Sequence, residues 1–469
     1  MSHLPPPLRL LGLATLAALA GCALSPRAPD ALDPLQGKAF EHVPLTHPVV
    51  ASVDRYEVRL PARERLPYTG KFASAFGGSL PYAPGSGLSF NKTEADGSLL
   101  FWGIGDRGPN GDSPDVDVHG RRQASKVFLA PDFVPRIAEI RVRPGQQAEV
   151  VRSIPLNYGG TPASGLPLKP GQTGSTGEIA LDDRLRPLPF SAVGIDPESL
   201  RTDRAGHFWI VDEYGPFLTE ADARGNVLRQ YAPGKGLPAI LASRQPNRGF
   251  EGLAITPSGR LYAAVQSTLD VDGKTRNSAR FIRLLELDPA TGATRQFAWP
   301  VDFDHFARAG DEKLGDIVAI DDTRFAVIDQ GMGRKGMRNA IYLIDIAAAD
   351  DISALNTPAG KPLEYATAGE LAGVRMLRPR PLVDLRELGW TAEKSEGLAL
   401  IPGGFAVIND NDFGLSTKVS GSKGEKASAY TVRDGRLDND GELSVVPNGE
   451  PTTLWLIRLR RPIAESFVK

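Results

Sequence analysis

Cysteine is nearly absent from this 469-residue chain: it has a single one, Cys22, and so cannot form an internal disulfide. Histidine is scarce as well, and none of the six is paired with another at metal-ligand spacing, which argues against a zinc or copper centre. Neither sign of charge dominates, because 54 basic residues face 56 acidic ones, and no polybasic stripe occurs. Nucleic acid is therefore not an expected partner. A Gly-x-Ser-x-Gly elbow and a phosphate-binding P-loop are also missing.

Long apolar runs are missing except at the start of the chain. Arg9 precedes the apolar stretch 10–20, which is too short to span a bilayer, and small residues then lead into Cys22. This order is typical of a bacterial lipoprotein signal, in which cleavage leaves Cys22 as a lipidated first residue; the alternative is a plain secretory signal. Ala23 follows where an aspartate would indicate retention at the inner membrane. We therefore expect attachment through Cys22 to the outer membrane, facing the periplasm.

Glycine and proline are abundant, with 50 and 39 residues spread along the chain, as expected for many short strands joined by tight turns. The segment 25–54 has no period and reads as a linker. The predicted organisation is a signal peptide over 1–21, a lipidated N-terminus and flexible tether over 22–54, and one domain over 55–469.

An internal repeat predicts the architecture. Five segments share one plan, in which a small or acidic start is followed by a short apolar strand, a turn, a second apolar strand and a polar end. They run over 87–106, 198–213, 251–266, 316–330 and 396–410. Further strand-like runs follow each hairpin, which indicates four-stranded antiparallel sheets and an all-β β-propeller. Six blades are favoured when the N-terminal strand is counted into a closing blade, within a range of five to seven; the rival is a pair of β-sandwiches.

Acidic residues recur at matching positions of the repeat. In a propeller the first strand of each blade lines the central channel, so Glu198, Glu251, Asp316 and Glu396 are expected to converge near the axis. The ends of the second strands would bring further polar groups to the same mouth: Asp106, Asp212, Glu213, Gln266, Asp329, Asn409, Asp410 and Asp412. Converging carboxylates need a bound cation, a nearby arginine or protonation. Surroundings rich in oxygen favour calcium or magnesium.

Each of these residues also has a purely structural interpretation. Glutamates at blade starts often hydrogen-bond the backbone of the next blade, so a latch and a ligand site stay equal alternatives for them. The pair at 212–213 and the tract 409–412 favour function, because they end strands and are dense in oxygen ligands. The acidic turns at 270–273 and 438–441 lack the glutamate that would complete a calcium loop. His119 and His305 lie in polar loops as candidate general acids, and His207 lies in a hairpin turn.

Several strings resemble a known family. They are Asp196-Pro197-Glu198-Ser199-Leu200, Asp212-Glu213-Tyr214-Gly215-Pro216, Asn247-Arg248-Gly249-Phe250-Glu251-Gly252-Leu253, Glu396-Gly397-Leu398-Ala399 and Asn409-Asp410-Asn411-Asp412. Together they resemble the bacterial phytase-like domain labelled "esterase-like activity of phytase", over about 70–459. The resemblance implies a propeller and the hydrolysis of phosphoesters or esters, and it brings no firmly assigned catalytic set with it.

These observations predict a calcium-assisted hydrolase of phosphoesters or carboxylic esters on a lipid-anchored, monomeric propeller. The expected calcium ligands are Glu198, Asp212, Glu213, Glu251, Glu396, Asp410 and Asp412. Glu251 is the expected catalytic residue, with Arg107 and Arg248 neutralising a small anionic or ester substrate. The alternative is a non-catalytic propeller that binds an envelope partner or ligand, with any calcium only structural.

Overall fold

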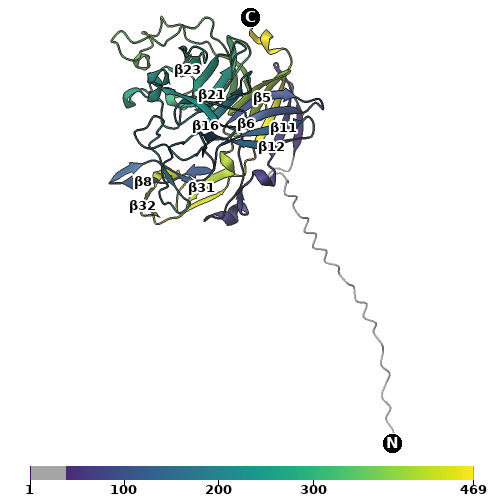
Figure 1. Ribbon diagram of the computed structural model, residues 1–469, viewed down its shortest axis with the longest axis vertical. Helices are drawn as coiled ribbons and strands as arrows, with labels where there is room; N and C mark the ends of the chain where they lie inside the picture. The colour runs from purple at the N-terminus through teal and green to yellow at the C-terminus, as the bar shows by residue number, and fades with distance from the viewer. Residues whose placement is uncertain (2–38, 468–469) are drawn as a thin grey trace.

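The computed structural model describes Met1 and residues 39–467, so Cys22 and nearly all of the predicted signal peptide lie outside the described residues (Figure 1). Within them the chain is built from strands, turns and short 3-10 segments. No helix in this part of the chain is long and apolar enough to cross a membrane.

Five antiparallel sheets surround one axis, and each has its first strand innermost. Blade 1 holds β5 (Gly87–Thr93), β6 (Leu99–Ile104), β11 (Arg136–Arg143) and β12 (Gln147–Pro155). Blade 2 holds β16 (Pro197–Thr202), β17 (Phe208–Asp212), β18 (Phe217–Ala221) and β19 (Val227–Pro233), with β20 (Gly236–Leu237) at its edge. Blade 3 holds β21 (Phe250–Ile255), β22 (Leu261–Val265), β23 (Phe281–Leu287) and β24 (Thr294–Pro300).

The other two blades follow the same plan. Blade 4 holds β25 (Lys313–Ala319), β26 (Arg324–Gly333), β27 (Gly336–Asp345) and β28 (Arg380–Asp384). Blade 5 holds β29 (Gly397–Ile401), β30 (Gly404–Ile408), β35 (Thr453–Leu459) and β2 (Val50–Arg59). The inner strands contact one another in the closed order β5, β16, β21, β25, β29 and back to β5. The predicted propeller is confirmed, with five blades.

The N-terminal strand accounts for the difference from the favoured count of six. β2 pairs antiparallel with β35, placing Tyr56 opposite Leu454, and so completes the last repeat instead of adding a blade. β2 also pairs in parallel with β12, which joins blades 5 and 1 into one sheet. β1 (Phe40–Pro44) then pairs with β2. Residues 40–54, expected to be tether, are therefore strand and linking turn, because a neighbouring sheet edge satisfies their backbone groups.

Apolar side chains fill the space between blades. All five residues of β17 are buried, since this strand has a sheet neighbour on each side and a blade against each face. Trp102 and Trp209 are 8% and 2% exposed, and Trp102 meets Phe208 of blade 2 edge-on, with ring centroids 5.1 Å apart. Both tryptophans are thus core residues, as the alternation along their strands predicts.

The long inserts form small sheets near one end of the ring. β7 (Asn110–Asp112) pairs with β10 (Ser125–Phe128), and β8 (Asp115–Val118) pairs with β32 (Thr431–Arg433). β31 (Leu415–Val419) contacts β7, and Figure 1 shows β8, β31 and β32 together at one end of the molecule. β7 follows the second strand of blade 1 and β31 follows the second strand of blade 5. These sheets therefore lie on the side where the shared plan of the repeats places its polar groups.

Candidate functional site: a carboxylate-lined mouth

A β-bulge turns an acidic residue toward the axis in three blades. The register of the inner hairpin shifts between Pro197 and Ser199, between Phe250 and Gly252, and between Leu314 and Ile317. Each shift leaves an acidic residue out of the pairing: Glu198, Glu251 and Asp316 respectively. Bulges commonly redirect a side chain beside a functional site. In blade 5, Glu396 stands at the corresponding place, one residue before β29.

Glycine follows the acid where two inner strands approach closely. A Cβ atom on Gly252 would lie 2.5 Å from the carbonyl oxygen of Gly315 in blade 4. A Cβ atom on Gly397 would lie 2.8 Å from the backbone nitrogen of Leu88 in blade 1. The recurrent Glu-Gly pair thus has a physical reason: the glutamate points to the channel while the glycine lets the next blade pack against it.

Two carboxylate triads share one residue at the mouth. One carboxylate oxygen each from Asp196, Glu198 and Glu213 lie within 4.8 Å of one another. The same holds for Glu198, Glu251 and Glu396. All five side chains are buried, with exposed fractions from 1% for Asp196 to 9% for Glu213. The structure therefore brings together four of the predicted ligands, Glu198, Glu213, Glu251 and Glu396, and adds Asp196.

Several acceptor atoms at the mouth are buried and have no hydrogen-bond donor within the described chain. They are Oδ2 of Asp196, Oε2 of Glu251 and Oε1 of Gln266. Gln266 donates through Nε2 to Oε1 of Glu213 at 3.2 Å. Among the described residues, no lysine, arginine or histidine nitrogen forms an ion pair with Glu198, Glu213, Glu251 or Glu396. Such a set of acceptors requires protons or a cation.

Burial raises the affinity of these carboxylates for protons. Desolvation raises the pKa of Glu251 to about 7, against the opposing effects of a hydrogen bond with Gln266 and of the charges of nearby lysines. The pKa values of Glu198, Glu213 and Glu396 are also raised, in each case mainly by burial, with a further contribution from the charge of Glu251. Burial therefore favours the protonated forms of these carboxylates when no cation is bound.

Asp316 has a different role from the glutamates at the same repeat position. Its Oδ2 accepts from Nη2 of Arg201 at 3.0 Å and from the backbone of Leu398 at 2.9 Å. Its Oδ1 accepts from the hydroxyl of Ser199 at 2.7 Å and from the backbone of Leu253 at 3.3 Å.

Arg201 extends this contact to the remaining blades. Its guanidinium donates to the carbonyl oxygens of Leu88, Ile317 and Leu398. Together with its partner Asp316 it reaches an inner strand of all five blades. This buried pair is an axial latch, formed by Asp316 and not by the glutamates for which the sequence left that alternative open.

Arg107 lies beside the mouth but is paired with carboxylates. Its Nη1 donates to Oε2 of Glu178 at 3.0 Å, and its backbone nitrogen donates to Oδ1 of Asp196, also at 3.0 Å. Nε of Arg107 is 3.5 Å from Oδ2 of Asp196. The side chain is 6% exposed. Arg107 therefore neutralises protein carboxylates, and the structure does not offer it as a free binder of a substrate anion.

Lys394 occupies the second acidic tract in the same way. Its Nζ lies 2.6 Å from Oδ2 of Asp410 and 2.8 Å from Oδ1 of Asp412. Asp410 is 4% exposed, whereas the side chain of Asp412 is 56% exposed. Neither belongs to the triads. These two predicted calcium ligands are thus ion-paired to a lysine.

Asp212 and Arg248, the remaining predicted residues, belong to neither triad. Asp212 accepts from the backbone nitrogens of Tyr214 and Gly215 and so holds the turn after β17. Arg248 donates to the hydroxyl of Ser267 at 3.1 Å and to the carbonyl oxygen of Gly310, and it forms no carboxylate ion pair among the described residues.

The histidines also lie away from the mouth. His119 is exposed in the turn after β8, His305 is buried in the insert before β25, and His207 pairs with Glu220 at 2.8 Å.

Sequence reasoning missed Asp196, Glu178 and Lys394 as members of the site. Asp196 lies two residues before Glu198, and Lys394 lies two residues before Glu396. Residues two apart on an extended chain share a face, so this spacing was a usable signal. Glu178 precedes β15 (Ile179–Leu181), in an insert where no repeat position identifies it.

The triads fit a calcium ion by size and by chemistry. Calcium takes carboxylate oxygens at about 2.3–2.6 Å, so oxygens on opposite sides of one ion lie roughly 4.6–5.2 Å apart. The ligand oxygens of each triad all lie within 4.8 Å of one another, close enough to contact one such ion. Nitrogen and sulfur ligands are absent from both triads. The donor set therefore suits a hard cation better than zinc or copper.

Fold and site together define a five-bladed β-propeller whose axial mouth is lined by buried carboxylates. The phytase-like family described as "Esterase-like activity of phytase" matches residues 86–413, well over half of the chain. The chain belongs to this family, as its Glu-Gly strings indicate.

Other comparisons add likenesses of lower coverage or similarity. An "Uncharacterized secreted protein" of Arthroderma benhamiae is 30% identical over 133 residues, which cover 22% of this chain and 26% of that protein. The chain thus matches about a quarter of that relative's length. Among solved structures, a luciferin-regenerating enzyme is 11% identical with a TM-score of 0.31, covering 81% of this chain and 94% of that one. A putative glycoside hydrolase from Parabacteroides distasonis is 12% identical with a TM-score of 0.31, covering 82% and 96%. At such values these likenesses say nothing about activity.

Proposed function

We propose that this protein is a cation-assisted hydrolase of small phosphoesters or carboxylic esters, with calcium as the favoured cation. The observation that carries the proposal is the pair of buried carboxylate triads that share Glu198 and leave Oε2 of Glu251 without a donor. A hydrophobic channel gains nothing from such a cluster, because unpaired buried carboxylates are costly. Membership in a family described by esterase-like activity supports the reaction class.

The residues divide between holding a cation and meeting the substrate. Asp196, Glu198, Glu213, Glu251 and Glu396 would hold the cation, which would polarise a phosphoryl or carbonyl oxygen. Glu251, with a pKa of about 7, is suited to accept or release a proton near neutral pH.

Arg248 is the better candidate to bind a substrate anion, since Arg107 is already paired with two carboxylates. Arg248 is half-buried, and its contacts are to neutral oxygens. Burial lowers its pKa, which an anionic ligand would reverse. Neutralising the substrate anion, a role that the sequence analysis gave to both Arg107 and Arg248, is thus assigned to Arg248 alone.

Location and attachment belong to the same proposal. The apolar stretch and Cys22 support a lipidated N-terminus at the periplasmic face of the outer membrane. Exposure to an envelope compartment would supply the calcium that the triads require. Globomycin treatment of producing cells should then lead to accumulation of the uncleaved precursor, and Cys22→Ser should release the protein from the membrane fraction.

A non-catalytic role is the second candidate, and the burial of the triads favours it. A cation enclosed among side chains at most 9% exposed would tie blades 2, 3 and 5 together without meeting a substrate. Calcium removal would then lower the unfolding temperature and affect no reaction.

The decisive experiment uses the soluble domain, stripped of cations and then assayed with and without calcium. The substrates are 4-nitrophenyl phosphate and 4-nitrophenyl acetate, and the variants are Glu251→Gln and Arg248→Gln. Glu442→Gln, an exposed glutamate outside the mouth, is the matched control. Calcium-dependent turnover that Glu251→Gln abolishes supports the hydrolase. Calcium-dependent stability without turnover of either ester favours the structural role.

A further inference from the structure

The basic residues around the carboxylate mouth fall into two groups, according to whether a carboxylate of the protein already pairs with them. On the side of blades 1 and 5, Arg107 and Lys394 are ion-paired. On the side of blades 3 and 4 lie Arg244, Arg248 and Lys313, each half-buried. None of these three forms an ion pair within the part of the chain that the structure describes. The positive charge that remains available to a ligand is therefore on one side of the mouth.

The two arginines of this group lie against the backbone next to Glu213. Nε of Arg244 donates to the carbonyl oxygen of Tyr214, the residue after Glu213, at 2.8 Å. Arg248 precedes Gly249, where a Cβ atom would lie 2.3 Å from the carbonyl oxygen of Glu213. The chain that carries both arginines thus packs directly against a member of one triad.

Lys313 begins β25 and lies close to Arg248. The hydroxyl of Ser267 accepts from Nη1 of Arg248 at 3.1 Å and donates to the carbonyl oxygen of Glu312, the residue before Lys313, at 2.9 Å. Nζ of Lys313 has no hydrogen-bond partner in the described chain. Its three donors are therefore available to a ligand.

The charges of this group act on the carboxylates of the mouth. Burial raises the pKa values of Glu213 and Glu251, and the charge of Lys313 is among the effects that oppose this rise. Burial lowers the pKa values of Arg244 and Arg248, and the charge of Glu213 opposes that fall. An oxyanion bound between these side chains would favour the charged form of both arginines.

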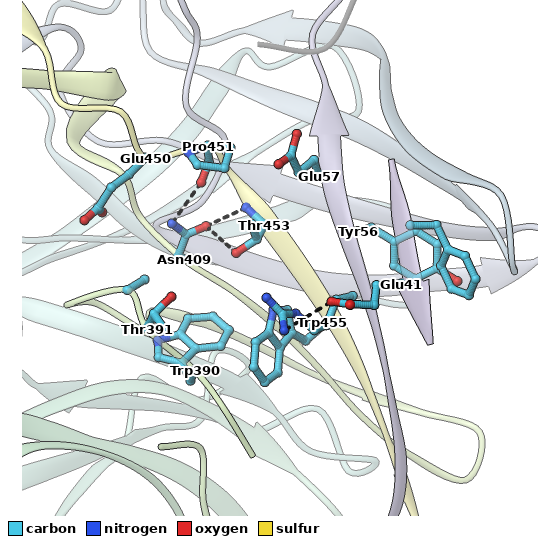
Figure 2. A pocket seen from close by; sticks show the side chains of 13 residues that line it. Glu41, Tyr56, Glu57, Trp390, Thr391, Asn409, Glu450, Pro451, Thr453 and Trp455 are labelled. Carbon is cyan, nitrogen blue, oxygen red and sulfur yellow. Dashed lines mark hydrogen bonds and ion pairs between the residues drawn. The ribbon is translucent and has the colours of Figure 1, made fainter. Parts of the chain in front are cut away.

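On the opposite side of the mouth, polar groups are bound to the protein itself. Asn409 follows the second strand of blade 5, where the repeat predicted a polar group at the mouth. Its Oδ1 accepts from the backbone nitrogen of Thr453 at 2.6 Å, and its Nδ2 donates to the carbonyl oxygen of Pro451 at 3.2 Å (Figure 2). Together with the ion pairs of Arg107 and Lys394, these contacts make the two sides of the mouth chemically different.

We propose that Arg244, Arg248 and Lys313 form an anion-binding side of the mouth, which selects a doubly charged phosphomonoester over a neutral carboxylic ester. The phosphoryl oxygens would lie toward blades 3 and 4, and the organic group would extend toward blades 5 and 1. A neutral carbonyl group carries no charge for these cations to bind. The assignment rests on the proposed function for its reaction, and it adds Arg244 and Lys313 to the one arginine named there.

The test measures binding of phenylphosphonate, a dianionic analogue whose P–C bond replaces the ester bond, and therefore needs no turnover. Calorimetric titration of the soluble domain at pH 8 and constant calcium gives its dissociation constant, with acetophenone as the neutral carbonyl probe. Phenylphosphonate should bind and acetophenone should not. Lys313→Gln should weaken phenylphosphonate binding at least roughly tenfold, the loss of one charged hydrogen bond, and Lys313→Arg should retain most of the affinity.

The matched control is Lys92→Gln, which removes an exposed lysine near the far end of β5 and should leave the dissociation constant unchanged. Since the side chain of Lys313 makes no hydrogen bond in the described chain, Lys313→Gln should unfold at the temperature of the wild type. A loss of affinity in this variant is then a loss of a ligand contact.

The outcomes separate this assignment from the hydrolase itself. Weaker phenylphosphonate binding by Lys313→Gln, with Lys92→Gln unaffected, supports the anion-binding side even if neither nitrophenyl ester is hydrolysed. Calcium-dependent hydrolysis of 4-nitrophenyl acetate, combined with equal phenylphosphonate affinity of the wild type and Lys313→Gln, would overturn the assignment and leave the hydrolase intact. Binding of acetophenone as tight as that of phenylphosphonate, or no saturable binding of phenylphosphonate, would also overturn it.

Discussion

Removing cations should make the folded protein less stable as the pH rises through neutrality. Glu251 is 2% exposed, and in the folded protein its pKa is about 7 against an ordinary 4.5. The folded state therefore binds this proton more tightly than the unfolded state does. The resulting stabilisation is complete below pH 4.5 and is lost as the pH rises to 7, because the folded state must then hold a buried charge.

The size of this effect follows from the pKa difference. Each pH unit between the two pKa values changes the free energy of unfolding by about 1.4 kcal/mol, so Glu251 accounts for about 3 kcal/mol between pH 4.5 and 7. Calcium binds the ionised carboxylates and should reverse the loss. At one hundred times its dissociation constant it restores about 2.7 kcal/mol.

The assay is urea unfolding of the cation-free soluble domain at pH values from 4.5 to 8. The measured quantity is the difference in unfolding free energy between the wild type and Glu251→Gln, whose amide stays neutral at every pH. This difference should move in favour of the variant by about 3 kcal/mol between pH 4.5 and 7. Glu442→Gln should show no such trend. A pH-independent difference for Glu251→Gln would refute the burial argument, and a trend that calcium leaves unchanged would refute the cation site.

Three further changes test the frame around the site. Asp316→Asn should lower the unfolding free energy by about 3–5 kcal/mol, because it leaves the buried guanidinium of Arg201 unpaired at the axis. Asp304→Asn, at an exposed position, should leave the unfolding free energy unchanged. Urea titration measures both variants. Lys394→Met should cost about 1–3 kcal/mol by the same assay, since a buried carboxylate loses its partner. Gly252→Ala places a methyl group 2.5 Å from the carbonyl oxygen of Gly315 and should lower the thermal midpoint. A midpoint equal to that of the wild type would contradict the close approach of blades 3 and 4.

The repeat was enough to predict the propeller, because the strands of each repeat pair with one another within a single blade. Strand alternation and turn residues decide such local hairpins. The blade count depended on a pairing between residues some four hundred positions apart, β2 with β35, for which the local pattern of 50–59 gives no partner. That strand was read partly as tether for the same reason.

The sequence predicted where the site lies, at the propeller axis, better than it predicted which residues form it. The repeat identified Glu198, Glu251 and Glu396 because a propeller brings equivalent residues to one axis. It gave no reason to separate them from Asp316, since all four precede an apolar strand. The cations that neutralise the other acids come from elsewhere in the fold. Lys394 precedes β29 and pairs with Asp410, which follows β30. The latch of Asp316 uses Arg201, which belongs to blade 2.

The contrast between Asp316 and Glu251 shows how one repeat position supports two kinds of chemistry. Asp316 is surrounded by five donors, so its charge is compensated by the protein and adds a link between blades. Glu251 forms no ion pair among the described residues, and its Oε2 has no donor there. A structural carboxylate is satisfied by its own fold, whereas one with a buried oxygen that lacks a donor retains the capacity to bind something else. By this criterion the axial ring divides into a latch at Asp316 and a site at the glutamates.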